Sequence, residues 1–116
     1  MKKTTPLKEN HLFRRAYQRG KTAADSRLAL YARRNGQKNN RLGLTVSTKV
    51  GCAVVRNRVR RRLREIYRLN EDRLVSGTDV VVVARIRAAS SQYRQLEHSF
   101  LKLADKLELL KKEGKA

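Results

Sequence analysis

Six arginines occupy the nine residues 56–64, inside the stretch VGCAVVRNRVRRRLR at 50–64. Each guanidinium group can bind phosphate oxygens through two parallel N–H bonds and can stack on flat rings, which a lysine ammonium cannot do. Asn57 adds an amide that both donates and accepts hydrogen bonds. Because Glu65 is the only acid within 56–68, pairing along a helix cannot neutralise the cluster. These residue types favour binding to a chain of phosphates.

The sequence does not bring together the residues that a protein needs for catalysis or metal binding. His11 and His98 are far apart and Cys52 is the only cysteine, so no metal-ligand spacing is present. The acids of the basic region, Glu65 and the pair at 71–72, stand singly or at helix ends. A nuclease that works by itself usually needs clustered carboxylates for two metals, or a histidine pair for acid–base work. We therefore expect no catalytic residue and no metal site in the protein.

Net charge and hydropathy indicate the kind of partner. The chain has 29 Lys and Arg against 10 Asp and Glu, a net charge of +19, whereas a small domain usually carries about 2–8 charges. A polyanionic partner explains this excess. The longest apolar run, at 80–84, is far shorter than the roughly 20 residues that span a bilayer, and no apolar stretch follows the basic N-terminus. With its single cysteine, the chain is expected in a reducing cytoplasm, without a membrane partner.

Hydrophobic periodicity predicts the elements that position these residues. A first helix over about 9–19 is expected to begin at Asn10 and to end at Gly20. Alternation predicts strands over 27–33 and 41–48, and the Asn35-Gly36 turn between them favours a hairpin. A weaker signal places a short strand at 21–25.

The second half of the chain is predicted to contain two long helices and one buried strand. The first helix spans 53–73, and its stripe consists of Val55, Val59, Leu63, Ile66 and Asn70. The β-branched run at 78–85 is typical of a strand that is covered on both faces. The last helix is expected to be capped by Ser90 or Ser91, and its stripe consists of Leu96, Phe100, Leu103, Leu107 and Leu110.

This order predicts one α+β domain over 1–116, an α/β sandwich with the element order α-β-β-β-α-β-α. Its mixed four-stranded sheet would carry two long helices on one face. Residues 1–6 and 111–116 are expected to be loose ends. On a helical wheel the arginines of 53–68 surround most of the circumference that the apolar stripe leaves, so the helix would pack by its stripe and expose its charges. A solvated basic face, a localisation signal or a membrane-surface helix explains this pattern less well than a nucleic-acid partner.

The first helix carries two aromatic residues four positions apart. Phe13 and Tyr17 share one helix face, next to Arg14. Either ring could simply pack in the hydrophobic core. The strand at 27–33 places Tyr31 and Arg33 on the sheet face that the two long helices leave free. Single-stranded RNA commonly binds to surfaces that combine aromatic and cationic groups, because its bases stack on the aromatic rings and its phosphates pair with the cations. The alternatives of a core and a stacking surface remain open at this point.

The stretch at 50–64 resembles the signature of the bacterial ribonuclease P protein subunit, whose hallmark is the triplet Arg56-Asn57-Arg58. The similarity continues through Phe13 and Tyr17 ahead of Gly20, the strand GLTVS before the motif and the strand DVVVVAR after it, and covers about 7–110. The resemblance implies a left-handed β-α-β crossover, against the general right-handed preference, and a fold similar to a domain of a small-subunit ribosomal protein and to the fourth domain of elongation factor G. Cys52, where many members carry a small polar residue, is expected to be an inert packing residue.

What the resemblance implies for function is an accessory role. Family members bind a large catalytic RNA and help it remove the 5′ leader of precursor tRNA, while the RNA performs the hydrolysis with bound Mg²⁺. We expect a monomeric protein in a 1:1 complex with this RNA, and no DNA partner. The predicted RNA-subunit contacts are Arg56, Asn57, Arg58, Arg60, Arg61, Arg62, Arg64 and Arg68. Phe13, Tyr17 and Tyr31 match the family's leader-binding cleft, to which proximity adds Arg14 and Arg33.

Two other functions remain to be weighed against this one. A ribosomal or other structural RNA-binding protein would share the charge, the size and the fold class. A protein-only nuclease is disfavoured because its catalytic cluster is missing. The combination of the contiguous motif with an aromatic first helix distinguishes the ribonuclease P subunit from a generic basic protein.

Overall fold

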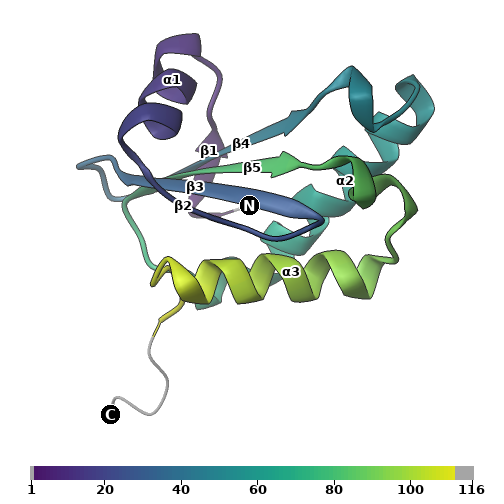
Figure 1. The fold of residues 1–116 in the computed structure, drawn as a ribbon. Coiled ribbons are helices and arrows are strands. Elements are labelled where there is room, and N and C mark those ends of the chain that lie inside the picture. The colour runs from purple at the N-terminus through teal and green to yellow at the C-terminus, as the bar shows by residue number, and fades with distance from the viewer. Residues whose placement is uncertain (1, 112–116) are drawn as a thin grey trace.

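A five-stranded sheet separates one helix of this protein from the other two (Figure 1). The computed structural model describes residues 2–111. Its strands are β1 (Thr4–Pro6), β2 (Lys21–Ala24), β3 (Leu28–Arg34), β4 (Asn40–Val46) and β5 (Thr78–Ala84). Its helices are α1 (Asn10–Arg19), α2 (Ala53–Asn70) and α3 (Tyr93–Lys106), with short 3₁₀ turns η1 (Thr48–Val50), η2 (Glu71–Arg73) and η3 (Ile86–Ser90). α1 covers one face of the sheet, and α2 and α3 cover the other (Figure 1).

The most apolar strand lies in the middle of the sheet, whose order is β1-β4-β5-β3-β2. β5 is parallel to β4 and antiparallel to β3, and nearly all of its residues are buried. The predicted hairpin between 27–33 and 41–48 is therefore wrong, although both strands form. A β-branched run that needs cover on both faces is most stable in a central position, so β5 lies between β3 and β4. β4, α2 and β5 together form a β-α-β unit with parallel neighbours.

The sheet has five strands and not the predicted four, because residues 4–6, which were expected to be loose, form the additional strand β1. β1 runs parallel to β4, in the register Thr4↔Asn40 to Pro6↔Leu42. The carboxylate of Glu71 accepts hydrogen bonds from the backbone N–H groups of Lys2 (3.2 Å) and Lys3 (3.1 Å) and from the Thr4 hydroxyl. These contacts hold the N-terminal segment against the end of α2. The other expected loose end, 111–116, lies outside the described residues except for Lys111.

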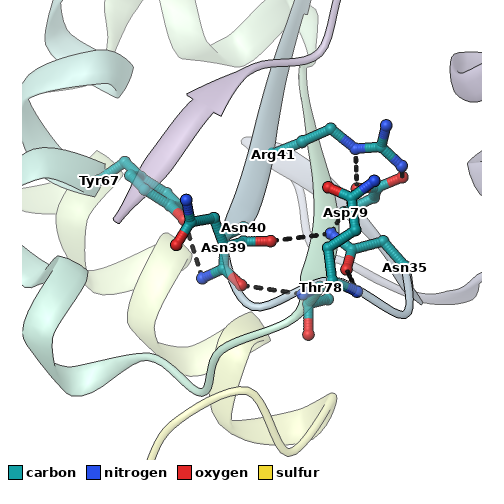
Figure 2. A network of polar contacts seen from close by, with 8 residues as sticks. Asn35, Asn39, Asn40, Arg41, Tyr67, Thr78 and Asp79 are labelled. Atoms are coloured by element: carbon teal, nitrogen blue, oxygen red, sulfur yellow. Dashed lines mark hydrogen bonds and ion pairs between the residues drawn. The ribbon is translucent and has the colours of Figure 1, made fainter. Parts of the chain in front are cut away.

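A polar network fixes the point where β4 and β5 begin (Figure 2). The buried side chain of Asn40 accepts a hydrogen bond from Thr78 N–H (2.8 Å) and donates to the hydroxyl of Tyr67 (3.3 Å). Arg41 donates both arms of its guanidinium group to Asp79, at 2.7 and 2.9 Å. Because buried polar groups need partners, these bonds specify which residues of the two parallel strands lie side by side.

The start of α3 differs from the prediction in its cap. Gln92, rather than Ser90 or Ser91, is the N-cap, and its side chain and that of Gln95 form a reciprocal capping box. Both serine hydroxyls instead donate to the carbonyl of Arg87, at 3.3 and 2.8 Å, within η3. They are therefore engaged in ending the preceding turn. The predicted apolar stripe of α3 is confirmed for Leu96, Phe100 and Leu103, which are all buried. The helix ends at Lys106, so Leu107 lies at its C-cap and Leu110 lies beyond it, where it forms a bridge with Leu74.

Candidate RNA interface

α2 packs against the sheet by its aliphatic stripe and carries arginine on the rest of its surface. Val59, Leu63 and Ile66 are buried and Val55 is half-buried, as the periodicity predicts. Tyr67 is also fully buried, where it contacts the ring of Phe100 at 6.2 Å between centroids. The predicted apolar stripe of this helix did not include Tyr67, although its place directly beside Ile66 was the available signal.

The predicted RNA contacts on α2 divide by exposure. Asn57, Arg61, Arg64 and Arg68 are exposed, while Arg56, Arg58, Arg60 and Arg62 are half-buried. The half-buried group lies next to the packed stripe, so its aliphatic stems are covered while the charged heads reach the surface. The predicted outward-facing arginine surface is therefore present in the structure. Hereafter we call these eight residues the arginine face.

Local contacts hold several members of the arginine face in place. Arg60 donates to the side-chain oxygen of Asn57 at 2.9 Å, which ties the two side chains together. Arg68 forms a bidentate pair with Glu65, at 2.6 and 3.0 Å. Hydrogen bonding from Arg68 lowers the pKa of the Glu65 carboxyl and Glu65 raises the pKa of Arg68. Arg68 is thus partly neutralised, which distinguishes it from the rest of the face.

The arginine face lines concave surface on both sides of α2. On the side of α3, Arg58, Arg61 and Arg62 line an open cavity of about 480 Å³ together with Glu65 and Tyr93. On the side of α1, two arginines line a smaller cavity of about 210 Å³, to which Phe13 also contributes. These two arginines are Arg60 and Arg64. The face is therefore a surface with two hollows rather than a flat band of charge.

The three predicted cleft aromatics gather where α1 crosses the sheet. Tyr17 contacts Tyr31 edge-on, with 4.9 Å between ring centroids, and lies 6.3 Å from Phe13. The Tyr17 hydroxyl shares a 2.8 Å hydrogen bond with the hydroxyl of Thr45 on β4. Tyr17 is 39% exposed, whereas Phe13 and Tyr31 are half-buried against a small core under α1. The rings thus have partial core roles and also present an aromatic surface.

The glycine at position 43 explains how Phe13 reaches the sheet. A Cβ atom placed on Gly43 would lie 2.6 Å from Phe13 Cε1, so the ring rests directly on the backbone of β4. The predicted strand over 41–48 includes Gly43, but its pattern did not indicate this role. The available signal was a glycine inside a predicted strand, because such a glycine often marks close approach by another group.

The two cations added by proximity are placed differently from one another. Arg14 is exposed on α1, directly after Phe13 in the chain. Arg33 lines a cavity of about 220 Å³ with Arg19, Lys21 and Arg34, towards the far end of α1. The structure therefore places Arg33 in a separate basic group. α1 begins after Glu9, which is its N-cap in place of the expected Asn10, and no side-chain cap bond forms there.

A further basic hollow lies where β4 and β5 end. Lys49, Arg85 and Arg87 line a cavity of about 590 Å³ with small polar residues such as Ser47. These cations were not among the predicted site residues. Their position directly after two strands was the available signal, since ligands of open sheets often bind at the carboxyl ends of parallel strands.

The carboxylates of the described chain are mostly engaged in structural contacts. Asp79 binds Arg41, Glu65 binds Arg68, and Glu71 holds the N-terminal segment. Within residues 2–111, no three His, Cys, Asp or Glu side chains gather as a metal-binding group. Across the same residues, no helix is both long and apolar enough to cross a membrane.

Comparison with known proteins identifies the family of this basic α+β protein. The family model described as Ribonuclease P matches residues 1–108. The chain belongs to the ribonuclease P protein family. It is therefore a tRNA-processing subunit of a ribonuclease complex, whose partners are the ribonuclease P RNA and precursor tRNA.

Individual relatives agree over almost the whole chain. The chain is 41% identical to the ribonuclease P protein component of Alkaliphilus metalliredigens, covering 95% of this chain and 99% of the relative. It is 44% identical to that of Caldanaerobacter subterraneus, covering 92% of each chain. Among solved structures, the RNase P protein of Staphylococcus aureus superposes with a TM-score of 0.84 at 28% identity, covering 91% of this chain and 97% of that one. That of Thermotoga maritima superposes with a TM-score of 0.77, also at 28% identity, covering 84% and 92%.

Proposed function

We propose that this protein is the accessory subunit of a ribonucleoprotein in which the RNA, rather than the protein, cleaves precursor tRNA. The observation that carries the proposal is the arginine face. Its charged groups point outward and line concave surface, and Glu65 is the single acid in this part of the helix that pairs with one of them. Such a surface binds phosphates, and it holds no nucleophile or general base that would perform hydrolysis.

The arginine face is the docking surface for the catalytic RNA. A protein that neutralises phosphates with guanidinium groups releases condensed counterions, which makes binding strong and dependent on salt. The exposed members, Asn57, Arg61 and Arg64, contact the RNA most directly. The half-buried members contribute charge and orientation. One protein binds one RNA in the cytoplasm.

The aromatic group on α1 and β3 receives the single-stranded 5′ leader. Tyr17 presents an exposed edge, and base–aromatic stacking tolerates any leader sequence because every base has a π-face. Phe13 and Tyr31 support this edge from beneath. The basic hollow around Lys49, Arg85 and Arg87 extends the positive surface towards the end of the sheet and attracts the leader phosphates.

The Mg²⁺ that the reaction requires is bound mainly by the RNA partner. The donor set of the protein fits a metal poorly, because Asp79, Glu65 and Glu71 are each engaged by cations or by backbone N–H groups. What the protein supplies is positive charge, which screens the repulsion between phosphates and lowers the Mg²⁺ concentration that the RNA needs.

Reconstitution tests this function. The purified chain alone should leave precursor tRNA intact, and the RNA alone should cleave it only at high Mg²⁺. Together they should cleave at low Mg²⁺. Cleavage by the protein alone would refute RNA-borne catalysis. A lack of stimulation would instead leave the chain as a structural RNA-binding protein.

A further inference from the structure

One cationic hollow lies at the opposite end of the sheet from the hollow around Lys49. It has a volume of about 220 Å³ and lies beside the end of β3, the start of β5 and the C-terminal end of α3 (Figure 1). None of the described residues that line it is acidic. Its cations, which we call the edge group, are Arg19, Lys21, Arg33 and Arg34. None of these four has a role in the proposed function.

A tight turn places the first two members of the edge group. Gly20 joins α1 to β2, and its N–H donates to the Ala16 carbonyl at 3.0 Å. A Cβ atom on Gly20 would lie 2.5 Å from that carbonyl oxygen and 2.8 Å from the carbonyl oxygen of Ala32, so only glycine lets α1 end directly against β3. Arg19 and Lys21 therefore flank a turn that is pressed onto the sheet.

The strand register divides the edge group between the two faces of the sheet. Lys21 pairs with Ala32 and Arg34 pairs with Thr78, so these side chains share one face. Ala32 belongs to the core under α2 and α3, so Lys21 and Arg34 lie on the face that these helices cover, next to the end of α3. Arg33 alternates to the face of α1. The edge group thus wraps around the end of the sheet.

The end of α3 does not need these cations as a cap. A helix C-terminus attracts positive charge, so cations beside it could have a purely structural role. However, the last carbonyls of α3 already accept backbone N–H groups from residues 107–109, at 3.1, 3.0 and 2.9 Å. The ion pairs of residues 2–111 also engage other cations, which are Lys3, Arg41, Arg68 and Lys102. The charges of the edge group are therefore available to an external anion.

We propose that the edge group binds phosphates of a second segment of the ribonuclease P RNA, remote from the segment on the arginine face. Cations gathered without acids bind phosphate oxygens and release condensed counterions. α2 lies over β4, whereas the edge group lies at β2 and β3, and β5 separates these two parts of the sheet. The protein thus bridges two parts of one RNA. This proposal rests on the proposed function in taking that RNA as the partner.

The leader of precursor tRNA fits this place less well. The aromatic group lies on the α1 face, and the hollow around Lys49 lies where β5 ends at Ala84. Arg34 instead pairs with Thr78, at the start of β5. A leader that follows the rings towards Lys49 therefore runs away from the edge group, which leaves the large RNA as the polyanion at this end.

An acidic protein also fits this place less well. Stable protein interfaces bury about 800 Å² on each partner around a largely apolar centre. The leucines that line this hollow, Leu107 and Leu109, are buried. None of the exposed large apolar side chains of the described chain lines it, and these are Tyr17, Val54, Leu69 and Ile86. The hollow offers charge without an apolar surface.

The salt dependence of affinity for the ribonuclease P RNA tests the proposal. Arg19→Gln/Arg34→Gln should reduce the slope of log affinity against log salt by roughly 1.5, since each lost contact contributes about 0.7–0.9. Lys38→Gln/Lys106→Gln is the matched control, because it removes two charges from exposed positions that do not line the hollow, and its slope should not change. A folded Arg19→Gln/Arg34→Gln variant with the wild-type slope would overturn the proposal.

Photocrosslinking within the complex of protein, ribonuclease P RNA and precursor tRNA identifies the occupant. Cys52→Ser removes the only cysteine, so that Arg34→Cys or Arg61→Cys can carry a photoreactive label. We expect the label at position 34 to modify the ribonuclease P RNA, at nucleotides that the label at position 61 does not reach. Modification of precursor tRNA alone, of the same nucleotides from both positions, or of no RNA would refute a second segment.

The outcomes separate this proposal from the proposed function. If the wild-type protein binds the ribonuclease P RNA and the loss of Arg19 and Arg34 leaves the slope unchanged, the second contact fails while RNA docking on α2 stands. If the wild-type protein does not bind this RNA at all, the proposed function fails, and the bridge between two RNA segments fails with it.

Discussion

Tyr17 connects two strands that are not neighbours in the sheet. Its ring contacts Tyr31 on β3 and its hydroxyl bonds to Thr45 on β4, so it spans the central strand β5. The ring remains partly exposed. A stacking surface that is fixed in this way loses little side-chain entropy when RNA binds, because its rotamer is already set.

Replacing the rings tests whether they bind the leader. We expect Phe13→Ala or Tyr17→Ala to abolish the gain in substrate affinity that a longer 5′ leader provides. Each lost stacking contact should weaken binding by about 1–3 kcal/mol. Affinities of precursor tRNAs with graded leaders, measured on the reconstituted enzyme, provide the readout.

Tyr17→Phe is the matched control, because it keeps the ring and loses only the bond to Thr45. It should retain most of the dependence on leader length. If both alanine variants fold and still distinguish leader lengths as the wild type does, the rings are core residues only.

At the scale of elements, β1 is paired with β4 and is also held by a distant carboxylate, that of Glu71. Burial alone would raise the pKa of Glu71, but hydrogen bonds from the Thr4 hydroxyl and the N–H groups of Lys3 and Lys2 outweigh it and lower the pKa below 4.5. β1 in turn supplies Thr5 and Pro6 to the wall of the cavity of about 210 Å³ that Arg60 and Arg64 also line. The end of α2 thus positions one wall of a site that its middle also lines.

We expect Glu71→Gln to destabilise the protein by about 1.5–3 kcal/mol, the scale of hydrogen bonds to a charged group. The lowered pKa means that this stabilisation is present above pH 4.5 and is lost as the pH falls through the folded value. Denaturant unfolding of both proteins between neutral and acidic pH measures the difference, which should shrink towards acid.

Asp72→Asn is the control, since Asp72 is adjacent to Glu71, is highly exposed and forms only a long ion pair with Lys3, at 3.9 Å. It should leave the free energy of unfolding unchanged. An equal loss in Asp72→Asn, or a Glu71→Gln deficit that does not vary with pH, would contradict the role of Glu71.

Local patterns predicted most elements, but long-range pairing decided their arrangement. The stripe from Val55 to Ile66 and the β-branched run of β5 are periodic signals within single segments, and both were interpreted correctly. The position of β5 between β3 and β4 could not be predicted from the sequence. The Asn35-Gly36 turn suits a tight hairpin as well as a connection between two strands that are not paired. β1 was missed because its strand partner β4 and the carboxylate of Glu71 that holds it are both distant in sequence.

The parts of the site that lie on single segments were predicted, and the part that several segments form was not. The arginine face could be read from one helix, and the aromatic group from the spacing of Phe13 and Tyr17 together with the family resemblance. The cavity between them could not be predicted, because Thr5, Leu44 and Arg64 come from three segments that only the sheet order brings together.

For the whole molecule, the net charge of +19 acts against the compact fold. We expect sulfate or phosphate to raise the melting temperature by several degrees, because anions bound to the folded state stabilise it by mass action. Chloride at equal ionic strength is the comparison, since it screens charge without bridging two guanidinium groups. A melting temperature that does not respond to sulfate would contradict this expectation.

The central claim is that the outward arginines of α2 bind phosphates of the catalytic RNA. The most direct test is the salt dependence of affinity for the ribonuclease P RNA, measured for Arg61→Gln/Arg64→Gln against Lys38→Gln/Lys106→Gln, a double variant of equal charge change in which both lysines are exposed. Each lost contact should reduce the slope of log affinity against log salt by about 0.7–0.9, so the arginine variant should show a slope smaller by roughly 1.5 and the lysine variant an unchanged one. Equal slopes for the arginine variant and the wild type would contradict the claim.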